Sequence, residues 1–316
     1  MAKWAIAVHG GAGVDPNLPL HRQDEAKKLL ERCLNLGIQA LRSNLPALDV
    51  VELVVRELET DPVFNSGRGS ALSEKGTVEM EASIMDGPNR RYGAVSGVTK
   101  VKNPVSLARL VMEKSPHSYL GFSGAEEFAL QQGVELMESE YFITQENVEM
   151  LKLAKEANAI VFDYRIPLKG LETCAAEANN PIIMNGLPIS VYAPETVGCV
   201  VVDRGGRCAA ATSTGGLMNK TTGRIGDSPI IGSGTYACKV CAVSCTGEGE
   251  AILRGTLARD VAAVMEYKGL GLQEAVDFAG LIAVSDKGEV AYGFNANGMF
   301  RGCASGDGFM EVGVWD

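Results

Sequence analysis

The N-terminal part of the chain alternates between short apolar runs and longer stretches in which apolar residues recur every three or four positions. Residues 3–8 form a short apolar run that ends at the glycine turn HGGAG, and we expect a strand there. From 21 to 43 the apolar residues recur at helical spacing, which predicts an amphipathic helix. A second helix is predicted over 47–60, with Asp49 as an acid in its first turn.

Two strands and three helices are predicted next. The segments TVEMEASIMD and RYGAVSGVTK read as strands, and the alternation in VEMEASIM indicates a sheet whose two faces are covered differently. Helices are predicted near 104–113, 123–132 and 146–157. Pairs of strands followed by runs of helices favour a layered α+β fold over repeated βαβ units.

The pattern fades over 158–195, a segment with several prolines, scattered asparagines and no sustained period. So long a stretch without secondary structure is uncommon inside a compact domain. We interpret it as a linker, a lid or a processing site, with a long surface loop as the plain alternative.

Regular pattern resumes at Thr196. TVGCVVVD and RCAAATST predict a hairpin around the turn RGG, and SCTGEGE opens a predicted helix, EAILRGTLARDVAAVMEYKG. Two smaller strands, GLIAVSD and EVAYGF, follow. This order fits two layers of strands with helices on the outside.

Charge and hydropathy exclude several classes of protein. The net charge is −10 and no block of Lys or Arg is long enough to follow a phosphate backbone, so we expect no nucleic-acid partner. The first residues are too glycine-rich for a signal peptide, and no apolar run reaches the ~18 residues of a membrane span. We therefore expect a soluble, cytoplasmic protein with no membrane partner.

The eight cysteines do not form the framework of a small secreted domain, and several lie in apolar runs. Cys238 and Cys241 have the spacing of a redox pair or half a zinc site, but none of the histidines lies at motif spacing from them. We expect reduced, mostly buried thiols.

Thr196 begins a buried strand directly after the unpatterned segment. A threonine hydroxyl needs a base to become nucleophilic, and its own α-amino group, with a pKa near ~8, can serve once the bond before it is cut. The bond Glu195-Thr196 is placed for such a cut. β-Branched residues also begin strands for packing reasons alone.

Further residues strengthen the catalytic interpretation. Thr214 ends the strand predicted to pair with the one that Thr196 opens. Thr246 and Gly247 come just before a predicted helix, where a hydroxyl and free N–H groups can hold an oxyanion. Arg224 and Asp227 share a glycine-rich turn and match the α-carboxylate and α-ammonium of an amino acid, or form a surface salt bridge.

Seven segments together carry a resemblance to a known family: HGGAG, FNSGRGS, PETVGCV, ATSTGG, NKTTGRIGDSP, SCTGEGE and FNANGM. In order and over nearly the whole chain, they resemble the plant-type L-asparaginases, also called isoaspartyl or β-aspartyl peptidases, which are N-terminal-nucleophile (Ntn) hydrolases with a threonine nucleophile. The glutamate before Thr196 is similar to that of legume members.

The resemblance implies a four-layer αββα sandwich made as a precursor that cuts itself at Glu195-Thr196. The products would be an α chain, 1–195, and a β chain, 196–316, assembled as (αβ)2. Thr196 would be the nucleophile and Thr214 would tune it, while Thr246, Gly247 and Asn65 would stabilise the oxyanion. The substrate-binding positions implied are Arg224, Ile225, Gly226, Asp227, Thr246, Gly247, Glu248 and Gly249.

The implied reaction is hydrolysis of L-asparagine and of β-aspartyl dipeptides through a β-aspartyl ester on Thr196. The resemblance implies no organic cofactor. It also implies a structural sodium ion on mainly backbone oxygens of Leu58, Glu59, Phe64, Ser66 and Arg68. Ser118 resembles the residue of potassium-activated members, in which His117 and Glu250 would act with Arg224 as a switch.

One feature departs from the family pattern. Its members have about ten more residues between GLQEAVDF and GLIAVSD, or two to three turns at ~3.6 residues each. This shortening, next to Phe278 and Gly280, bears on folding, dimerisation and cleavage. It keeps open an uncleaved protein of the same fold that binds aspartyl ligands or a partner. A glycosylasparaginase-like enzyme is a third reading, but it would need a secretory signal and disulfides.

Overall fold

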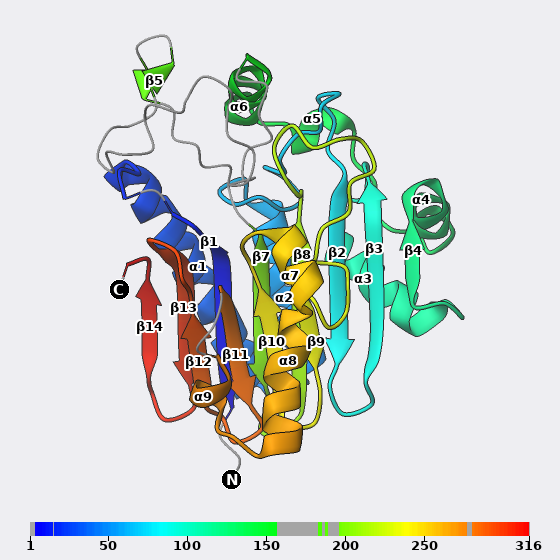
Figure 1. The fold of residues 1–316 in the computed structure, drawn as a ribbon. Helices are drawn as coiled ribbons and strands as arrows, with labels where there is room; N and C mark the ends of the chain where they lie inside the picture. The colour runs from blue at the N-terminus through cyan, green and yellow to red at the C-terminus, as the bar shows by residue number, and fades with distance from the viewer. Residues whose placement is uncertain are drawn as a thin grey trace.

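The computed structural model describes residues 4–14, 16–156, 196–276 and 280–315, together with the two-residue strands β5 (Ile183–Met184) and β6 (Leu187–Pro188). Two sheets stack face to face and helices cover the outer face of each, as Figure 1 shows. This is the predicted αββα sandwich. The predicted linker 158–195 lies outside the described residues, apart from β5 and β6.

The larger sheet has eight strands in the order β14-β13-β1-β7-β8-β2-β3-β4. Its centre joins the start of the chain to the strands that follow Thr196, because β1 pairs with β7 and β7 with β8, both antiparallel. The bounds are β1 Ala5–Ala12, β2 Met80–Asp86, β3 Arg91–Val98, β4 Tyr119–Gly121, β7 Val197–Val202, β8 Cys208–Thr214, β13 Met299–Ser305 and β14 Met310–Gly313.

The smaller sheet has the order β12-β11-β10-β9 and lies against the middle of the larger one, with β10 packed on β7 and β8. Its strands are β9 Thr235–Ala237, β10 Cys241–Cys245, β11 Leu281–Ser285 and β12 Val290–Gly293. Alanine, valine and cysteine side chains fill the space between the sheets, and their small size allows a close approach.

Three helices cover the outer face of the larger sheet: α1 Leu20–Arg42, α2 Ala47–Thr60 and α3 Pro104–Lys114. Their apolar faces build a second core against that sheet. Three further helices, α4 Phe122–Gln131, α5 Ser139–Phe142 and α6 Gln145–Glu156, complete this part of the chain. The helix predictions from periodicity are confirmed to within a residue or two, whereas α5 and the short β4 carry too few residues to show a period.

The helical layer over the smaller sheet differs from its prediction. The single helix expected after SCTGEGE is broken at Thr256, whose φ is +48°. It forms α7 (Gly249–Gly255), α8 (Leu257–Ala263) and a π-helical turn, η1 (Val264–Lys268). A left-handed β-branched residue is strained, so tertiary packing overrides the local helical period here. The helix α9 (Leu272–Val276) leads toward β11.

The first strand is also longer than predicted. β1 continues through HGGA instead of ending at Val8, with an irregularity in the pairing with β13 between His9 and Gly11. Gly11 has a φ of +110°, and a side chain at Gly10 would overlap the ring of Phe64. The glycines therefore let the strand continue as a bulge instead of ending in a turn. Among the described helices, none combines the length and apolar character needed to cross a membrane.

Candidate active site

Thr196 and Thr214 face each other at one end of the central hairpin. Val197 pairs with Ser213 in the β7–β8 register, so the next residue on each strand is the threonine. The Thr196 Oγ1 donates a hydrogen bond to Thr214 Oγ1 over 3.1 Å. Thr196 is half-buried and Thr214 is buried, so the Thr196 side chain is partly accessible while its partner lies in the packed interior. Both hydroxyls lie at the ends of paired strands, where the sequence predicted them, and Glu195, the residue before Thr196, lies outside the described residues.

Thr214 is in turn fixed by the loop that follows it. The Gly216 N–H donates to Thr214 Oγ1 over 3.0 Å, so this oxygen accepts from both neighbours and retains its own proton. Asn65 holds the same turn: its Nδ2 donates to the Gly216 carbonyl over 2.7 Å, and its Oδ1 accepts from the Gly215 N–H. The structure thus gives Asn65 a positioning contact, while its role toward an oxyanion stays a prediction.

Arg224 and Asp227, the pair predicted to bind the α-carboxylate and α-ammonium of a substrate, lie in the loop between β8 and β9. We call them the gripping pair, and residues 215–228 the gripping loop. Arg224 forms a two-point ion pair with Glu250 of α7, with Nε to Oε1 at 3.0 Å and Nη2 to Oε2 at 2.9 Å. Asp227 is buried, and among the described residues its Oδ2 has no hydrogen-bond partner. Burial raises the pKa of Asp227 to about 7, against the opposing effect of Arg224. A buried carboxylate oxygen without a donor is suited to an incoming cation.

Gly249 brings the two members of this pair to one small space. A side chain there would meet Arg224 Nη2 at 2.7 Å and Asp227 Oδ1 at 2.9 Å. At Gly216, beside Thr214, a side chain would lie 3.3 Å from Arg224 Nη1. The threonine hydroxyls and the gripping pair therefore lie close to one another. A residue with a side chain at Gly216 or Gly249 would fill the space between them.

Two buried ionisable side chains hold this loop in place: Lys220, within the loop, and Glu81 of β2. They were not predicted from the sequence. Lys220 is almost fully buried, and its Nζ donates to the carbonyls of Glu79 at 2.7 Å and Gly215 at 2.9 Å. Glu81, paired with Thr214 across the β2–β8 ladder, accepts from the Gly226 N–H at 3.0 Å. Burial raises the pKa of Glu81 and lowers that of Lys220. Glu81, an acidic residue in the apolar segment MEASIM, was the one sequence feature that could have indicated these buried charges.

The predicted oxyanion residues follow β10. The Thr246 N–H donates to the Gly280 carbonyl at 2.8 Å, so this group is occupied. Its buried Oγ1 has no hydrogen-bond partner among the described residues, which makes the hydroxyl the available donor. Gly247 has a φ of +137°, a conformation that favours glycine. Glu248 precedes α7, a helix of only seven residues, and Ile225 is half-buried on the rim of the gripping loop.

Comparison with known proteins shows the family of this chain. A family model described as "Asparaginase" matches residues 2–314. The chain belongs to this family. It is 74% identical, over all of both chains, to the "Probable isoaspartyl peptidase/L-asparaginase 2" of Arabidopsis thaliana. It is 40% identical to the "Isoaspartyl peptidase" of Escherichia coli (strain K12), over 95% of this chain and 92% of the relative. It is 38% identical to the "Isoaspartyl peptidase/L-asparaginase" of Homo sapiens, over 98% and 95%.

The length of this asparaginase-family chain differs from that of the plant relative. Their alignment spans 326 positions against 316 residues here, so ten positions of the relative have no counterpart. That agrees in size with the shortening predicted before β11. The predicted site of the shortening, at Phe278, lies outside the described residues. Gly280, which follows it, is the residue whose carbonyl holds the Thr246 N–H.

The loop after α2 provides oxygen atoms of the kind expected for a sodium site. The Leu58 carbonyl accepts from the Ser66 hydroxyl at 3.3 Å, and the Glu59 carbonyl from the Arg68 N–H at 2.7 Å. A side chain at Gly69 would meet the carbonyls of Pro62 at 2.6 Å and Phe64 at 2.9 Å. The loop therefore wraps its carbonyl oxygens inward, and uncharged oxygens suit a hard cation.

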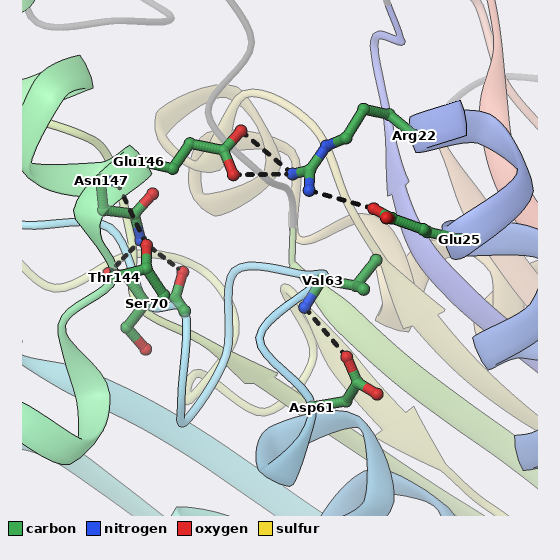
Figure 2. A network of polar contacts seen from close by, with 9 residues as sticks. Arg22, Glu25, Asp61, Val63, Ser70, Thr144, Glu146 and Asn147 are labelled. Atoms are coloured by element: carbon green, nitrogen blue, oxygen red, sulfur yellow. Dashed lines mark hydrogen bonds and ion pairs between the residues drawn. The ribbon is translucent and has the colours of Figure 1, made fainter. Parts of the chain in front are cut away.

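This loop is held from its outer side by α6, as Figure 2 shows. Asn147 is buried, and its Nδ2 donates to the carbonyls of Gly69 at 2.8 Å and Ser70 at 2.9 Å. Arg22 of α1 ties the same helix down through Glu146, with Nη2 at 3.0 Å from the carboxylate. The last helix before the predicted linker thus fixes the loop that carries Asn65.

The residues predicted for a potassium switch are less closely associated. His117 and Ser118 are both exposed, on the connection between α3 and β4. The His117 N–H donates to Ser115 Oγ at 3.0 Å, and the Ser118 carbonyl accepts from Ala94 of β3. Of the residues predicted for the switch, only Glu250 forms a hydrogen bond with Arg224 among the described residues.

The pair Cys238 and Cys241 flanks the tight turn of the β9–β10 hairpin. Both thiols are buried, with their sulfur atoms 3.8 Å apart. The contact with Cys241 lowers the pKa of Cys238 to about 7. The seven described cysteines are free and buried, as predicted, and the described residues contain no cluster of His, Cys, Asp or Glu that could hold a metal ion.

Proposed function

We propose that the chain is a threonine-nucleophile amidohydrolase that hydrolyses L-asparagine and the β-aspartyl bond of isoaspartyl dipeptides. The observation that carries the proposal is the juxtaposition of two features. A hydroxyl pair, Thr196 and Thr214, borders the place at Gly249 where Arg224 and the buried carboxylate of Asp227 approach each other, and among the described residues one oxygen of that carboxylate lacks a donor. The names of the relatives, isoaspartyl peptidase and L-asparaginase, agree with this chemistry.

Maturation would proceed by attack of the Thr196 hydroxyl on the carbonyl carbon of Glu195. The peptide nitrogen gains a proton and leaves as the free amine of Thr196, so an ester replaces the peptide bond. Water then hydrolyses the ester and releases the Glu195 carboxylate and the hydroxyl. The position of Thr196 directly before a fully buried strand supports this step, because the strand holds the new N-terminus rigidly.

In the mature enzyme the Thr196 amine would act as base. It takes the hydroxyl proton while Oγ1 attacks the side-chain carbonyl of asparagine, and the unpaired Thr246 hydroxyl donates to the developing oxyanion. The amine then passes its proton to the leaving nitrogen, which departs as ammonia, or as an α-amino acid when a dipeptide is cut. Water, deprotonated by the same amine, hydrolyses the β-aspartyl ester and releases L-aspartate.

Substrate selection would rest on the free aspartyl head. Asp227 offers an oxygen to the α-ammonium, and the Arg224 fork matches an α-carboxylate. Glu250 occupies that fork in the structure, so a substrate carboxylate has to displace or share it. Because both contacts address only the α-carbon groups, the leaving group is free to be ammonia or a longer amine, which explains two substrates for one site.

The assembly and ion predictions belong to the same proposal. We propose cleaved α (1–195) and β (196–316) chains associated as (αβ)2. A sodium ion would be held by carbonyl oxygens of the loop around Leu58, Glu59 and Phe64, and would rigidify that loop. Potassium activation through Ser118 and His117, and a cytoplasmic location, remain predictions of the sequence.

A denaturing gel together with an ammonia assay tests the proposed function. The purified chain should yield fragments of 195 and 121 residues and release ammonia from asparagine. Thr196→Ala should stay at full length with activity reduced at least about 10³-fold, whereas Thr196→Ser, which keeps the hydroxyl, should still be cut. A full-length, inactive wild-type chain that still binds L-aspartate would favour the uncleaved binding protein instead.

A further inference from the structure

Four residues of the larger sheet form one row across its four central strands. His9 of β1 pairs with Gly198 of β7, Gly198 with Thr212 of β8, and Thr212 with Ser83 of β2. All three side chains in this row are completely buried. A row of polar side chains in the space between two sheets is expensive unless every group is hydrogen-bonded.

Gly198 leaves a gap in this row, and a residue of the opposite sheet fills it. Ser244 of β10 enters the space, since a side chain at Gly198 would overlap both Ser244 Oγ and His9 Nε2. Ser244 pairs with Thr235 on the smaller sheet, so a second row of hydroxyls faces the first. The packing of Ser244 against Gly198 therefore explains why this position, two residues after Thr196, is a glycine, which the sequence alone did not show.

The two rows join into one continuous hydrogen-bonded chain. His9 Nε2 meets Ser244 Oγ at 2.8 Å, Ser244 Oγ meets Thr212 Oγ1 at 2.7 Å, and Thr212 Oγ1 meets Thr235 Oγ1 at 2.6 Å. Ser83 Oγ lies 2.9 Å from Thr235 Oγ1 and 2.6 Å from the Ser228 carbonyl. At the other end, His9 Nδ1 lies 3.1 Å from the carbonyl oxygen of Thr196.

The direction of each hydrogen bond from His9 to Thr235 follows from the end of the chain at Thr196. A carbonyl only accepts, so His9 Nδ1 carries the proton, and a neutral imidazole then accepts at Nε2. Ser244 must therefore spend its single proton on His9. Thr212 must donate to Ser244, and Thr235 to Thr212. An imidazolium would present two donors and force the hydroxyls to reverse.

The surroundings of His9 favour the neutral ring. Burial lowers the pKa of His9 to about 3, against a small opposing effect of the Thr196 carbonyl. Among the described residues, the groups that hydrogen-bond with the ring are the hydroxyl of Ser244 and that carbonyl, both uncharged.

We propose that His9, locked as its Nδ1–H tautomer by the hydroxyls behind it, is a positioning residue that fixes the main chain of Thr196 for both self-cleavage and turnover. The inference rests on the proposed function. Thr196 directly precedes β7, and after cleavage it would have no residue before it. The bond from His9 then restrains the carbonyl side of a chain end that would otherwise fray. The far end of the row contacts Ser228, next to Asp227, so the same hydroxyls tie the nucleophile to the gripping loop.

Two substitutions at His9 separate its two ring nitrogens. His9→Asn keeps a donor near the place of Nδ1 and should hold kcat within about threefold of the wild type. His9→Gln keeps a group near the place of Nε2 but removes the donor to Thr196, so kcat should fall about 10- to 100-fold. KM should stay within about twofold in both, and self-cleavage should slow only in His9→Gln. Equal losses in the two variants would contradict a positioning role.

Ser244→Ala provides a test that leaves His9 in place. Removal of the Ser244 hydroxyl frees the imidazole to turn, and kcat should fall about 3- to 10-fold with KM unchanged. Ser285→Ala is the matched control, because Ser285 is a buried serine of the same sheet outside the row, bonded to Glu289. An equal kcat for Ser244→Ala and Ser285→Ala would overturn the role of the row.

A spectroscopic measurement decides the tautomer independently of activity and of variant folding. The chain has only three histidines, so selective ¹⁵N labelling gives few signals, and His21→Gln and His117→Gln assign the exposed two. His9 should show a protonated Nδ1 and an unprotonated Nε2. A protonated Nε2 would refute the proposal. If the wild-type chain released no ammonia the proposed function would fail, whereas this spectrum would still decide the state of His9.

Discussion

The two halves of the active site are built from different materials. The nucleophile corner, formed by Thr196, Thr214 and His9, consists of neutral groups on paired strands. The gripping loop, residues 215–228, carries Arg224 and Asp227 on irregular backbone and is held by its own buried Lys220 and by the buried Glu81 of β2. Strands fix a hydroxyl without charge, whereas the loop needs buried ions to hold its shape.

The difference assigns separate tasks to the two regions. The strand pairing holds the two hydroxyls 3.1 Å apart, so the nucleophile corner should act on the rate of the chemical step. The gripping loop contains an arginine paired with Glu250 and a carboxylate oxygen that no described residue donates to, so it should act on substrate affinity. Substitutions in the two regions should accordingly divide between kcat and KM.

The largest effect in this comparison is expected at Asp227. Asp227→Asn keeps the shape but loses the charge that would pair with the α-ammonium, a loss of about 2–5 kcal/mol for a desolvated ion pair. We expect kcat/KM for asparagine to fall about 10²- to 10³-fold, mainly through KM. Self-cleavage should be unaffected, because the precursor presents no ammonium there. Steady-state kinetics and a gel measure both, and a loss confined to kcat would break the proposed division.

The same residue predicts a pH dependence of binding. With a pKa of about 7 in the free protein, Asp227 is protonated below that pH and cannot pair with an ammonium. The Kd for L-aspartate should therefore rise about tenfold for each pH unit below 7 and level off above it. Calorimetry on the mature enzyme measures this, and Asp227→Asn should remove the dependence. A flat profile in the wild type would show that Asp227 is already ionised.

A smaller effect is expected at Thr214. Thr214→Val keeps the strand and the volume but removes the oxygen that accepts from Thr196, a change of about 1–3 kcal/mol. We expect kcat to fall about 10- to 100-fold with KM nearly constant, while Thr214→Ser should retain most of the rate. An increase in KM larger than the decrease in kcat would show that the nucleophile corner also contributes to binding.

The last prediction concerns stability rather than turnover, at a buried carboxyl that lies outside both regions. Glu59 is completely buried, its Oε1 accepts from the Val105 N–H, and burial raises its pKa to about 8. Between its unfolded pKa near ~4.3 and about 8, only the folded state binds this proton, so stability falls as the pH rises through that window. Glu59→Gln should therefore melt higher than the wild type at pH 8.5 and nearly equally at pH 5. Equal melting at both values would contradict the shifted pKa.

The sequence predicted the fold well wherever an element was long and periodic. The bounds of α2 and the β7–β8 hairpin follow from spacing alone. It failed where packing overrides local preference, as at Thr256, where a left-handed residue divides the predicted helix into α7 and α8. It also could not show that HGGA continues β1, because a glycine bulge and a glycine turn have the same composition.

For the site, the sequence predicted which residues should lie together around a substrate. Hydroxyls at strand ends and an Arg/Asp pair in a glycine-rich turn are local features, and the structure brings Thr196, Thr214, Arg224 and Asp227 together. Only the tertiary structure decided how they are supported. The row from His9 to Ser83, and the contact of Lys220 in the gripping loop with the Glu79 carbonyl, depend on residues that are far apart in the sequence and adjacent in the fold. Such contacts arise from strand order and sheet stacking, and they leave no period or spacing in the chain that could announce them.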